Sequence, residues 1–206
     1  MFEPILQGIF LGVAIAAPLG PTNVEVIRRG VKEGWKSSLL FYAGVNVALI
    51  IYLLLATFGL SFLLQIRLFN LILLAAGVLV LFYLAYSALT DFLKSKEVDL
   101  SSKSISKRNF FDGIALTITN PAVLLIWTSI LGANSASKGA SLTDNLMVSL
   151  GILAGAFLFV GTLILLTHYG RNFIASKHYK YVSLASGILL LYFALTFGYA
   201  LVLALQ

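Results

Sequence analysis

Hydrophobic residues run along this chain in six long stretches, and the short segments between them hold most of the charged side chains. The stretches cover residues 4–27, 38–64, 67–90, 110–133, 143–168 and 179–204. Each is long enough to cross a hydrocarbon core of ~30 Å, which takes about 20 residues of α-helix. The pattern predicts an all-α, polytopic membrane protein with six transmembrane helices, forming a single domain over residues 1–206.

Proline interrupts two of these stretches at corresponding places. The first interruption is Pro18-Leu19-Gly20-Pro21-Thr22-Asn23, and the second is Thr119-Asn120-Pro121. Proline removes a backbone N–H and clashes with the preceding helical turn, so both helices should break there. Such a break is tolerated in a membrane only where protein or a water-filled cavity surrounds the unpaired backbone groups. Paired breaks in corresponding segments are typical of the binding site of a secondary transporter.

The two interrupted stretches belong to two similar halves of the chain. Residues 76–85 and 186–195 both have a small residue, a glycine and then a run of Leu, Phe, Tyr and Ala. We therefore predict two three-helix repeats, residues 1–90 and 110–206, joined by a cytoplasmic linker over residues 91–109. Because three spans is an odd number, the two copies would have opposite orientations, an inverted repeat as in transporters that work by alternating access.

Composition and charge place the chain in a membrane. It is 60% hydrophobic and 11% charged, a balance typical of a polytopic membrane protein. Twelve of its fourteen Lys and Arg residues fall in segments 28–37, 91–109 and 169–180. The positive-inside rule puts these basic loops in the cytoplasm and both termini outside the cell membrane. Since this asymmetry accounts for the net charge of +6, we expect no nucleic-acid partner.

The first break supplies candidate substrate-binding residues. If a second half-helix starts with Pro21 in its first turn, its N-terminus exposes backbone N–H groups at the positive end of the helix dipole. Such an end binds a carboxylate without a basic side chain. The candidates are Pro18, Gly20, Pro21, Thr22 and Asn23 at the first break, and Asn120 and Pro121 at the second. The alternative is a simple proline kink in each helix, with no ligand.

Three further polar residues are candidates for substrate binding or ion coupling. Glu25 is the main intramembrane carboxylate. Such groups are costly to bury, so their presence in a membrane span indicates a function. The alternative role of Glu25 is an interfacial ion pair with Arg28 and Arg29, which follow at helical spacing. Asp112 is a second candidate for ion coupling, or else a charge near a helix N-terminus. Asn46 either faces a cavity or makes a hydrogen bond between helices.

Two further features concern packing and chemistry. Gly8-x3-Gly12 and Gly151-x3-Gly155 predict close helix packing, either within one chain or between copies in a homo-oligomer. The absence of cysteine excludes disulfides, thiolate metal sites and thiol redox chemistry. With no intramembrane His cluster, Ser/Lys dyad or Asp pair in the sequence, we predict neither enzyme activity, nor a cofactor, nor a bound metal.

The residues around the breaks carry a family resemblance. Residues 17–23, followed by Val26-Ile27-Arg28-Arg29-Gly30 and Gly34, resemble the first-span signature of the lysine exporter (LysE/RhtB) family. Phe111-x-Gly113, followed by Asn120-Pro121 and Trp127, resembles the fourth-span motif of the same family. Gly77 and the Leu-Phe-Tyr-Leu run after it resemble the third-span motif. The resemblance covers most of the chain.

This resemblance implies an exporter of amino acids or similar small metabolites, driven by proton antiport. The coupling ion would be a proton, with sodium as the alternative. Many relatives have an acidic residue where this chain has Asn46, so Glu25 or Asp112 would have to carry the proton. Related groups move metal cations, so a metal-cation or other small-solute transporter is one alternative function, and a non-transport membrane assembly subunit is another.

Overall fold

The computed structural model describes residues 2–57, 66–94, 106–120, 123, 126–127, 129–130, 142–171 and 176–205. Within these residues the regular structure is helical. The main helices are α1 (Phe2–Ala16), α2 (Pro21–Glu33), α3 (Trp35–Thr57), α4 (Arg67–Lys94), α5 (Arg108–Ile118), α7 (Leu142–Gly170) and α8 (Ser176–Leu205). The predicted all-α class is therefore confirmed for the part of the chain that the structure describes.

The first predicted break is present. Helix α1 ends at Ala16, α2 begins at Pro21, and the two axes differ in direction by 75°. Gly20 is extended (φ −97°, ψ 178°), and Pro21 takes the first helical position. A backbone N–H at this position would have no partner within the helix, so proline costs no hydrogen bond there. The sequence Pro-Leu-Gly-Pro thus ends one helix and starts the next, as proline chemistry requires.

The second break has the same cause in the sequence. Helix α5 stops at Ile118, and Thr119 follows it as the C-cap residue. Pro121 lies outside the described residues. The residue before a proline is biased away from the helical region, so Asn120-Pro121 explains why α5 ends here.

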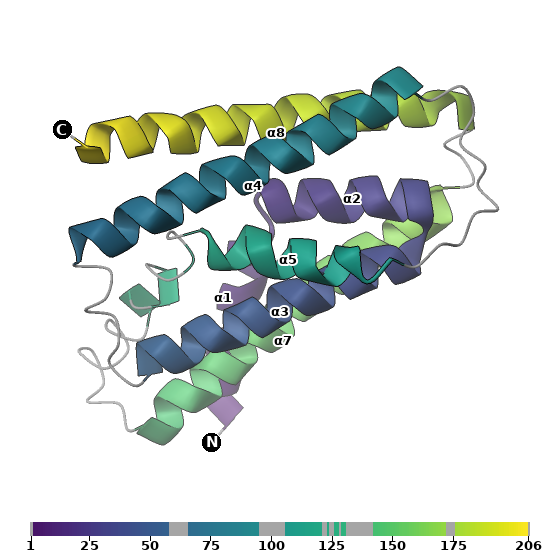
Figure 1. The fold of residues 1–206 in the computed structure, drawn as a ribbon. Helices are drawn as coiled ribbons and strands as arrows, with labels where there is room; N and C mark the ends of the chain where they lie inside the picture. Colours follow the sequence, from purple (N-terminus) through teal and green to yellow (C-terminus); the bar gives the residue numbers. More distant parts are fainter. Residues whose placement is uncertain are drawn as a thin grey trace.

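The helices pack in three pairs, of which α4–α8 is antiparallel and the other two run in the same direction (Figure 1). Helix α1 packs on α7, α3 on α5, and α4 on α8. Helix α3 also contacts α7, which joins the first two pairs into one group, whereas the α4–α8 pair forms a second group. Helix α2 lies between the groups and contacts α3, α5 and α7 on one side and α8 on the other. This short helix is therefore the main link between the two groups.

Glycines allow the closest helix crossings. A Cβ atom on Gly8 would collide with the Val148 carbonyl oxygen, and one on Gly151 with the carbonyl oxygen of Ile5. The α3–α5 crossing repeats this arrangement, because a Cβ on Gly44 would meet the Phe110 carbonyl oxygen and one on Gly113 that of Phe41. The predicted packing of Gly8-x3-Gly12 on another helix is therefore made within one chain, against Gly151-x3-Gly155.

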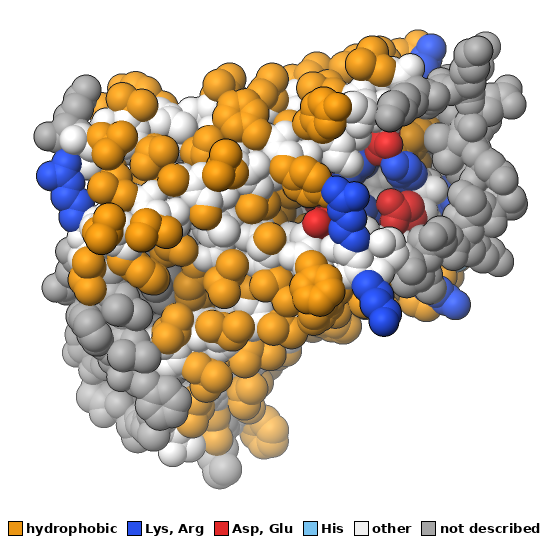
Figure 2. All heavy atoms as spheres, in the orientation of Figure 1, with side chains coloured by type: hydrophobic (Ala, Val, Ile, Leu, Met, Phe, Trp, Pro, Cys, Tyr) orange, Lys and Arg blue, Asp and Glu red, His pale blue; other side chains and the backbone are white. Residues whose placement is uncertain are grey.

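The long helices are suited to a membrane. Four are long and apolar enough to cross one, over Trp35–Leu55, Arg67–Leu93, Thr143–Gly170 and Tyr179–Leu205, and the bent α1–α2 pair makes a fifth if it is one span. Hydrophobic side chains cover most of the face shown in Figure 2, and charged side chains gather toward one end. Six spans in two inverted repeats stay a prediction, as do the orientation of the termini and the single-domain boundaries.

Candidate functional site

A cavity of about 310 Å³ lies at the first break. It is lined by parts of α1, α2, α3, α5 and α7 and by the segment after α5. Six of the eight predicted substrate-binding residues line it: Pro18, Gly20, Pro21, Thr22, Asn23 and Asn120. The structure thus brings both interrupted segments, about 100 residues apart in the sequence, to one cavity of ligand-binding size.

The start of α2 forms one wall of this cavity. Gly20 has no side chain with which to cap the helix, and the Val24 N–H is the first to bond back, to the Gly20 carbonyl at 3.1 Å. The N–H groups of Thr22 and Asn23 precede it in the first turn, where helices leave donors without an intrahelical partner. This end of the helix therefore presents donors and a positive dipole to the cavity.

The Asn23 side chain holds the break together. Its amide donates to the Ala16 carbonyl at 2.8 Å and to the Pro18 carbonyl at 2.9 Å, and the residue is only 4% exposed. These are carbonyls that a continuous helix would have paired through the backbone. Asn23 therefore stabilises the shape of the site with its side-chain N–H groups.

At the second break, the side chains of Tyr52 and Thr119 bind backbone carbonyls near the end of α5. The Tyr52 hydroxyl, from α3, donates to the Ile118 carbonyl at the end of α5. The Thr119 hydroxyl donates to the Ala115 carbonyl at 2.6 Å, and the Asn120 N–H to the Thr117 carbonyl at 3.1 Å. Sequence reasoning missed Tyr52, because its partner is 66 residues away and only the fold brings them together.

Two buried hydroxyls in the cavity wall were also missed. Tyr42, on α3, is 2% exposed, and Thr117, on α5, is 4% exposed. Neither hydroxyl makes a hydrogen bond of normal geometry within the described residues, and the Tyr42 hydroxyl lies near the Asn46 side chain. Buried hydroxyls are normally paired, so these two are positioned for a ligand or for water in the cavity. Both lie on apolar helix stretches, where nothing in the sequence separates them from ordinary packing residues.

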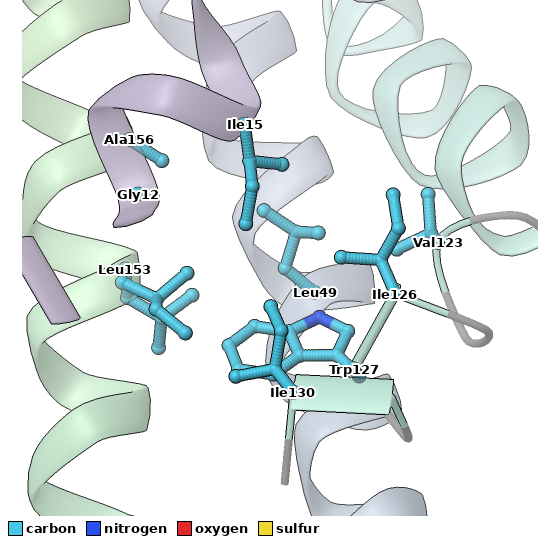
Figure 3. A pocket seen from close by; sticks show the side chains of 10 residues that line it. Gly12, Ile15, Leu49, Val123, Ile126, Trp127, Ile130, Leu153 and Ala156 are labelled. Carbon is cyan, nitrogen blue, oxygen red and sulfur yellow. The ribbon is translucent and has the colours of Figure 1, made fainter. Parts of the chain in front are cut away.

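A second, smaller pocket of about 90 Å³ adjoins this cavity (Figure 3). The two share Ile15, Leu49, Val123, Ile126 and Ala156 in their linings. Trp127, Ile130 and Leu153 contribute further apolar surface, and Trp127 is 3% exposed. The combined space therefore has a polar part at the helix break and an apolar extension.

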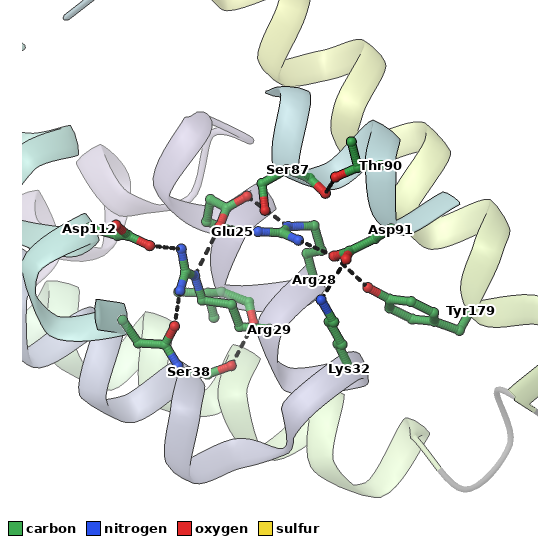
Figure 4. A network of polar contacts seen from close by, with 12 residues as sticks. Glu25, Arg28, Arg29, Lys32, Ser38, Ser87, Thr90, Asp91, Asp112 and Tyr179 are labelled. Carbon is green, nitrogen blue, oxygen red and sulfur yellow. Dashed lines mark hydrogen bonds and ion pairs between the residues drawn. The ribbon is translucent and has the colours of Figure 1, made fainter. Parts of the chain in front are cut away.

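Charged side chains gather further along α2, outside the cavity lining (Figure 4). Glu25 is fully buried and forms ion pairs with Arg28 and Arg29, each at 2.9 Å. This is the ion pair that the sequence offered as the alternative to a coupling role. Both arginines are themselves buried, at 4% and 3% exposure, so the pairs are made away from water.

The arginines extend this charged cluster to both helix groups. Arg28 contacts Asp91 of α4 at 2.7 Å, and Lys32 contacts the same carboxylate at 2.6 Å. Arg29 contacts Asp112 of α5 at 2.8 Å. The predicted linker over residues 91–109 includes Asp91, but α4 continues to Lys94, so Asp91 lies on a helix. We call Glu25, Arg28, Arg29, Lys32, Asp91 and Asp112 the charged cluster.

Asn46 lies one helical turn from Tyr42, outside the cavity lining and outside the charged cluster. Its side-chain amide donates to the Tyr42 carbonyl at 2.8 Å, one turn back on the same helix. The residue is half-buried and does not line the cavity. Asn46 is therefore the one described substrate-binding candidate that the structure does not bring to the cavity.

Comparisons with known proteins identify the class that this cavity and these helices define. The family model described as "LysE type translocator" matches residues 13–201. The chain belongs to this family of translocators, which confirms the resemblance noted from the sequence. It also supports the expectation that the protein is a transporter in a membrane and not an enzyme.

Individual relatives match over nearly their whole length. The chain is 29% identical to the Bacillus subtilis (strain 168) protein named "Putative amino acid efflux protein YcgF", over 94% of each chain. It is 26% identical to the arginine exporter protein ArgO of Escherichia coli (strain K12) and to that of Shigella flexneri, over 95% of this chain and 93% of theirs. No solved structure matches.

Proposed function

We propose that this protein is a secondary active transporter that exports an amino acid across the cytoplasmic membrane by alternating access. The observation that carries the proposal is the cavity at the helix break, where the N-terminus of α2 faces uncharged polar groups. A free amino acid has a carboxylate that suits a helix N-terminus. The relatives named as amino acid efflux and arginine exporter proteins support the same class of substrate.

The helix pairing supports an inverted repeat. If the first three spans correspond to the last three, exchanging the halves turns the α1–α7 pair into the α5–α3 pair and leaves the α4–α8 pair in place. The glycine contacts of the two crossings follow that exchange. Such a repeat allows one half to move against the other around a central site. We propose that both termini lie outside and that the charged cluster lies at the cytoplasmic side.

We further propose that the coupling ion is a proton carried by Glu25 or Asp112. Both acids bind Arg29. Protonating Asp112 would weaken a contact between α2 and α5, whereas protonating Glu25 would remove a charge that holds Arg28 and Arg29 in place within α2. A proton that loosens the charged cluster would link ion movement to helix movement. Sodium is the alternative coupling ion, and a homo-oligomer in the bilayer is compatible with this scheme.

Gly20→Leu tests the proposed site. A Cβ at Gly20 has no neighbouring atom within 4 Å, and its φ of −97° suits any residue, so the variant should fold. The added side chain would enter the cavity and compete with the substrate. We expect flux of radiolabelled amino acids from proteoliposomes to fall at least about tenfold, an effect of about 1.4 kcal/mol on binding.

Gly161→Leu on α7 is the matched control, because Gly161 also has open space around its Cβ position and does not line the cavity. It should transport at the wild-type rate. Normal flux in a folded Gly20→Leu variant would show that the substrate binds elsewhere.

A further inference from the structure

We propose that the substrate is a zwitterionic amino acid with an uncharged aliphatic side chain, and that the Tyr42 and Thr117 hydroxyls bind its polar end. This inference rests on the proposed function and narrows it to one class of amino acid. It depends on three features: the absence of charge from the cavity lining, the two hydroxyls without partners, and the apolar pocket.

The cavity offers no counter-charge for a cationic side chain. None of the described residues that line it is an Asp or Glu, and the sequence contains neither residue between positions 113 and 143. The nearest acid along α2 is Glu25, which already pairs with Arg28 and Arg29. A guanidinium or a side-chain ammonium group would therefore lose its hydration without gaining an ion pair, which disfavours its binding.

The polar part of the cavity, at the helix break, suits the polar end of a zwitterion. Its carboxylate would accept hydrogen bonds from the first turn of α2. Its ammonium group needs acceptors, and a hydroxyl oxygen accepts while its O–H donates. The Tyr42 and Thr117 hydroxyls are at least nine-tenths buried, line the cavity and have no partner in the described structure. They are the groups best placed to bind an ammonium and a carboxylate oxygen together.

The adjoining pocket suits the side chain. Its lining is aliphatic apart from Trp127, and its volume of about 90 Å³ is roughly that of three waters in the liquid. Because it shares five residues with the main cavity, a ligand bound at the break could extend directly into it. An aliphatic chain of leucine size would remove apolar surface from water there, whereas a charged chain would not.

A substrate panel tests the class directly. Wild-type protein in proteoliposomes should carry radiolabelled leucine at least about tenfold better, in kcat/KM, than arginine or lysine. Arginine or lysine carried as well as leucine would overturn this inference and leave the export function intact. If no amino acid is carried, the proposed function fails, and the inference fails with it.

Single-atom changes test the hydroxyls. Thr117→Val replaces the hydroxyl by a methyl group of similar size, and Tyr42→Phe removes the hydroxyl. Each should raise the KM for leucine about tenfold and leave protein stability near that of the wild type. Thr167→Val is the control, because the Thr167 hydroxyl is also buried but donates to the Leu163 carbonyl and lies outside the cavity. A wild-type KM in both cavity variants would overturn the assignment of these hydroxyls.

Leu153→Phe tests the apolar pocket separately. Leu153 lines the pocket but not the main cavity, so the larger ring should fill the space meant for the substrate side chain. Flux of leucine should fall several-fold while flux of alanine, which needs little of this pocket, stays near the wild-type rate. An equal loss of both would show that the pocket does not select the side chain.

Discussion

Two neighbouring parts of α2 differ in whether their buried polar groups have partners. Its first turn, Pro21–Asn23, borders a cavity whose described lining has no charged side chain and includes two hydroxyls without partners. The next turns, Glu25–Lys32, carry four charged side chains, all of which are in ion pairs. The two parts are separated by less than one helical turn.

The difference follows from the cost of burying each kind of group. A buried charge without a partner is far more costly than a buried hydroxyl without one, so the charged cluster must be complete in the resting protein. Neutral groups can stay unpaired until a ligand or water arrives. We infer that the charged cluster holds the two helix groups together, while the first turn of α2 is available for binding.

Removing the central carboxylate should have the largest effect. Glu25→Gln leaves Arg28 and Arg29 buried with one compensating charge fewer, and breaking such a pair costs about 3–5 kcal/mol. We expect a large fall in the thermal midpoint of the purified protein in detergent. Transport should be lost at every imposed pH gradient, because the folded protein itself is depleted.

Glu33→Gln is the control for this change. Glu33 also lies on α2, but it is half-buried and accepts a hydrogen bond from the neutral Asn109 amide at 2.7 Å. It should lose no more than about 1 kcal/mol. A Glu25→Gln protein as stable as wild type, with only its gradient-driven flux abolished, would contradict this structural role and would assign proton coupling to Glu25 and not to Asp112.

Cutting the link to α4 should have a smaller effect. Asp91→Asn weakens the contacts with Arg28 and Lys32, but the Asp91 side chain is 18% exposed, so water replaces part of what is lost. We expect a loss of about 1–2 kcal/mol in the free energy of unfolding. Amide hydrogen exchange should speed up in the last turns of α4, where this carboxylate ties the helix to α2.

Thr90→Val gives a matched comparison on the same helix, since the Thr90 hydroxyl donates only to the nearby Ser87 carbonyl at 2.9 Å. It should leave exchange in the last turns of α4 near the wild-type rate. Unchanged exchange in Asp91→Asn would mean that apolar packing alone joins the α4–α8 pair to the rest of the molecule.

The helix breaks could be predicted from the sequence because proline acts locally. Pro18, Pro21 and Gly20 determine where α1 ends and α2 begins whatever else the chain does. The candidate residues at the two breaks were therefore named without the structure, and six of them line one cavity. The helical spacing of Glu25, Arg28 and Arg29 likewise indicated an ion pair as one of two roles for Glu25.

Residues whose roles depend on distant partners could not be found in this way. Tyr42 and Thr117 look like packing residues until the fold places both hydroxyls in the cavity wall. Asp91 looked like part of a soluble linker because its partners, Arg28 and Lys32, are about 60 residues earlier in the chain. Contacts between residues this far apart in the chain leave no local pattern in the sequence.

Asn46 should give the smallest effect and marks the edge of the cavity. Its amide adds a hydrogen bond to the Tyr42 carbonyl within one helix, and even the hydrogen bonds between membrane helices average only about 0.6 kcal/mol. Asn46→Ala should therefore keep its thermal midpoint and transport leucine within about twofold of wild type, a difference of less than 0.5 kcal/mol. A tenfold fall in flux with unchanged stability would place Asn46 among the binding groups. The cavity would then extend further along α3, and the contrast between an uncharged site and a charged cluster would have to include this position on α3.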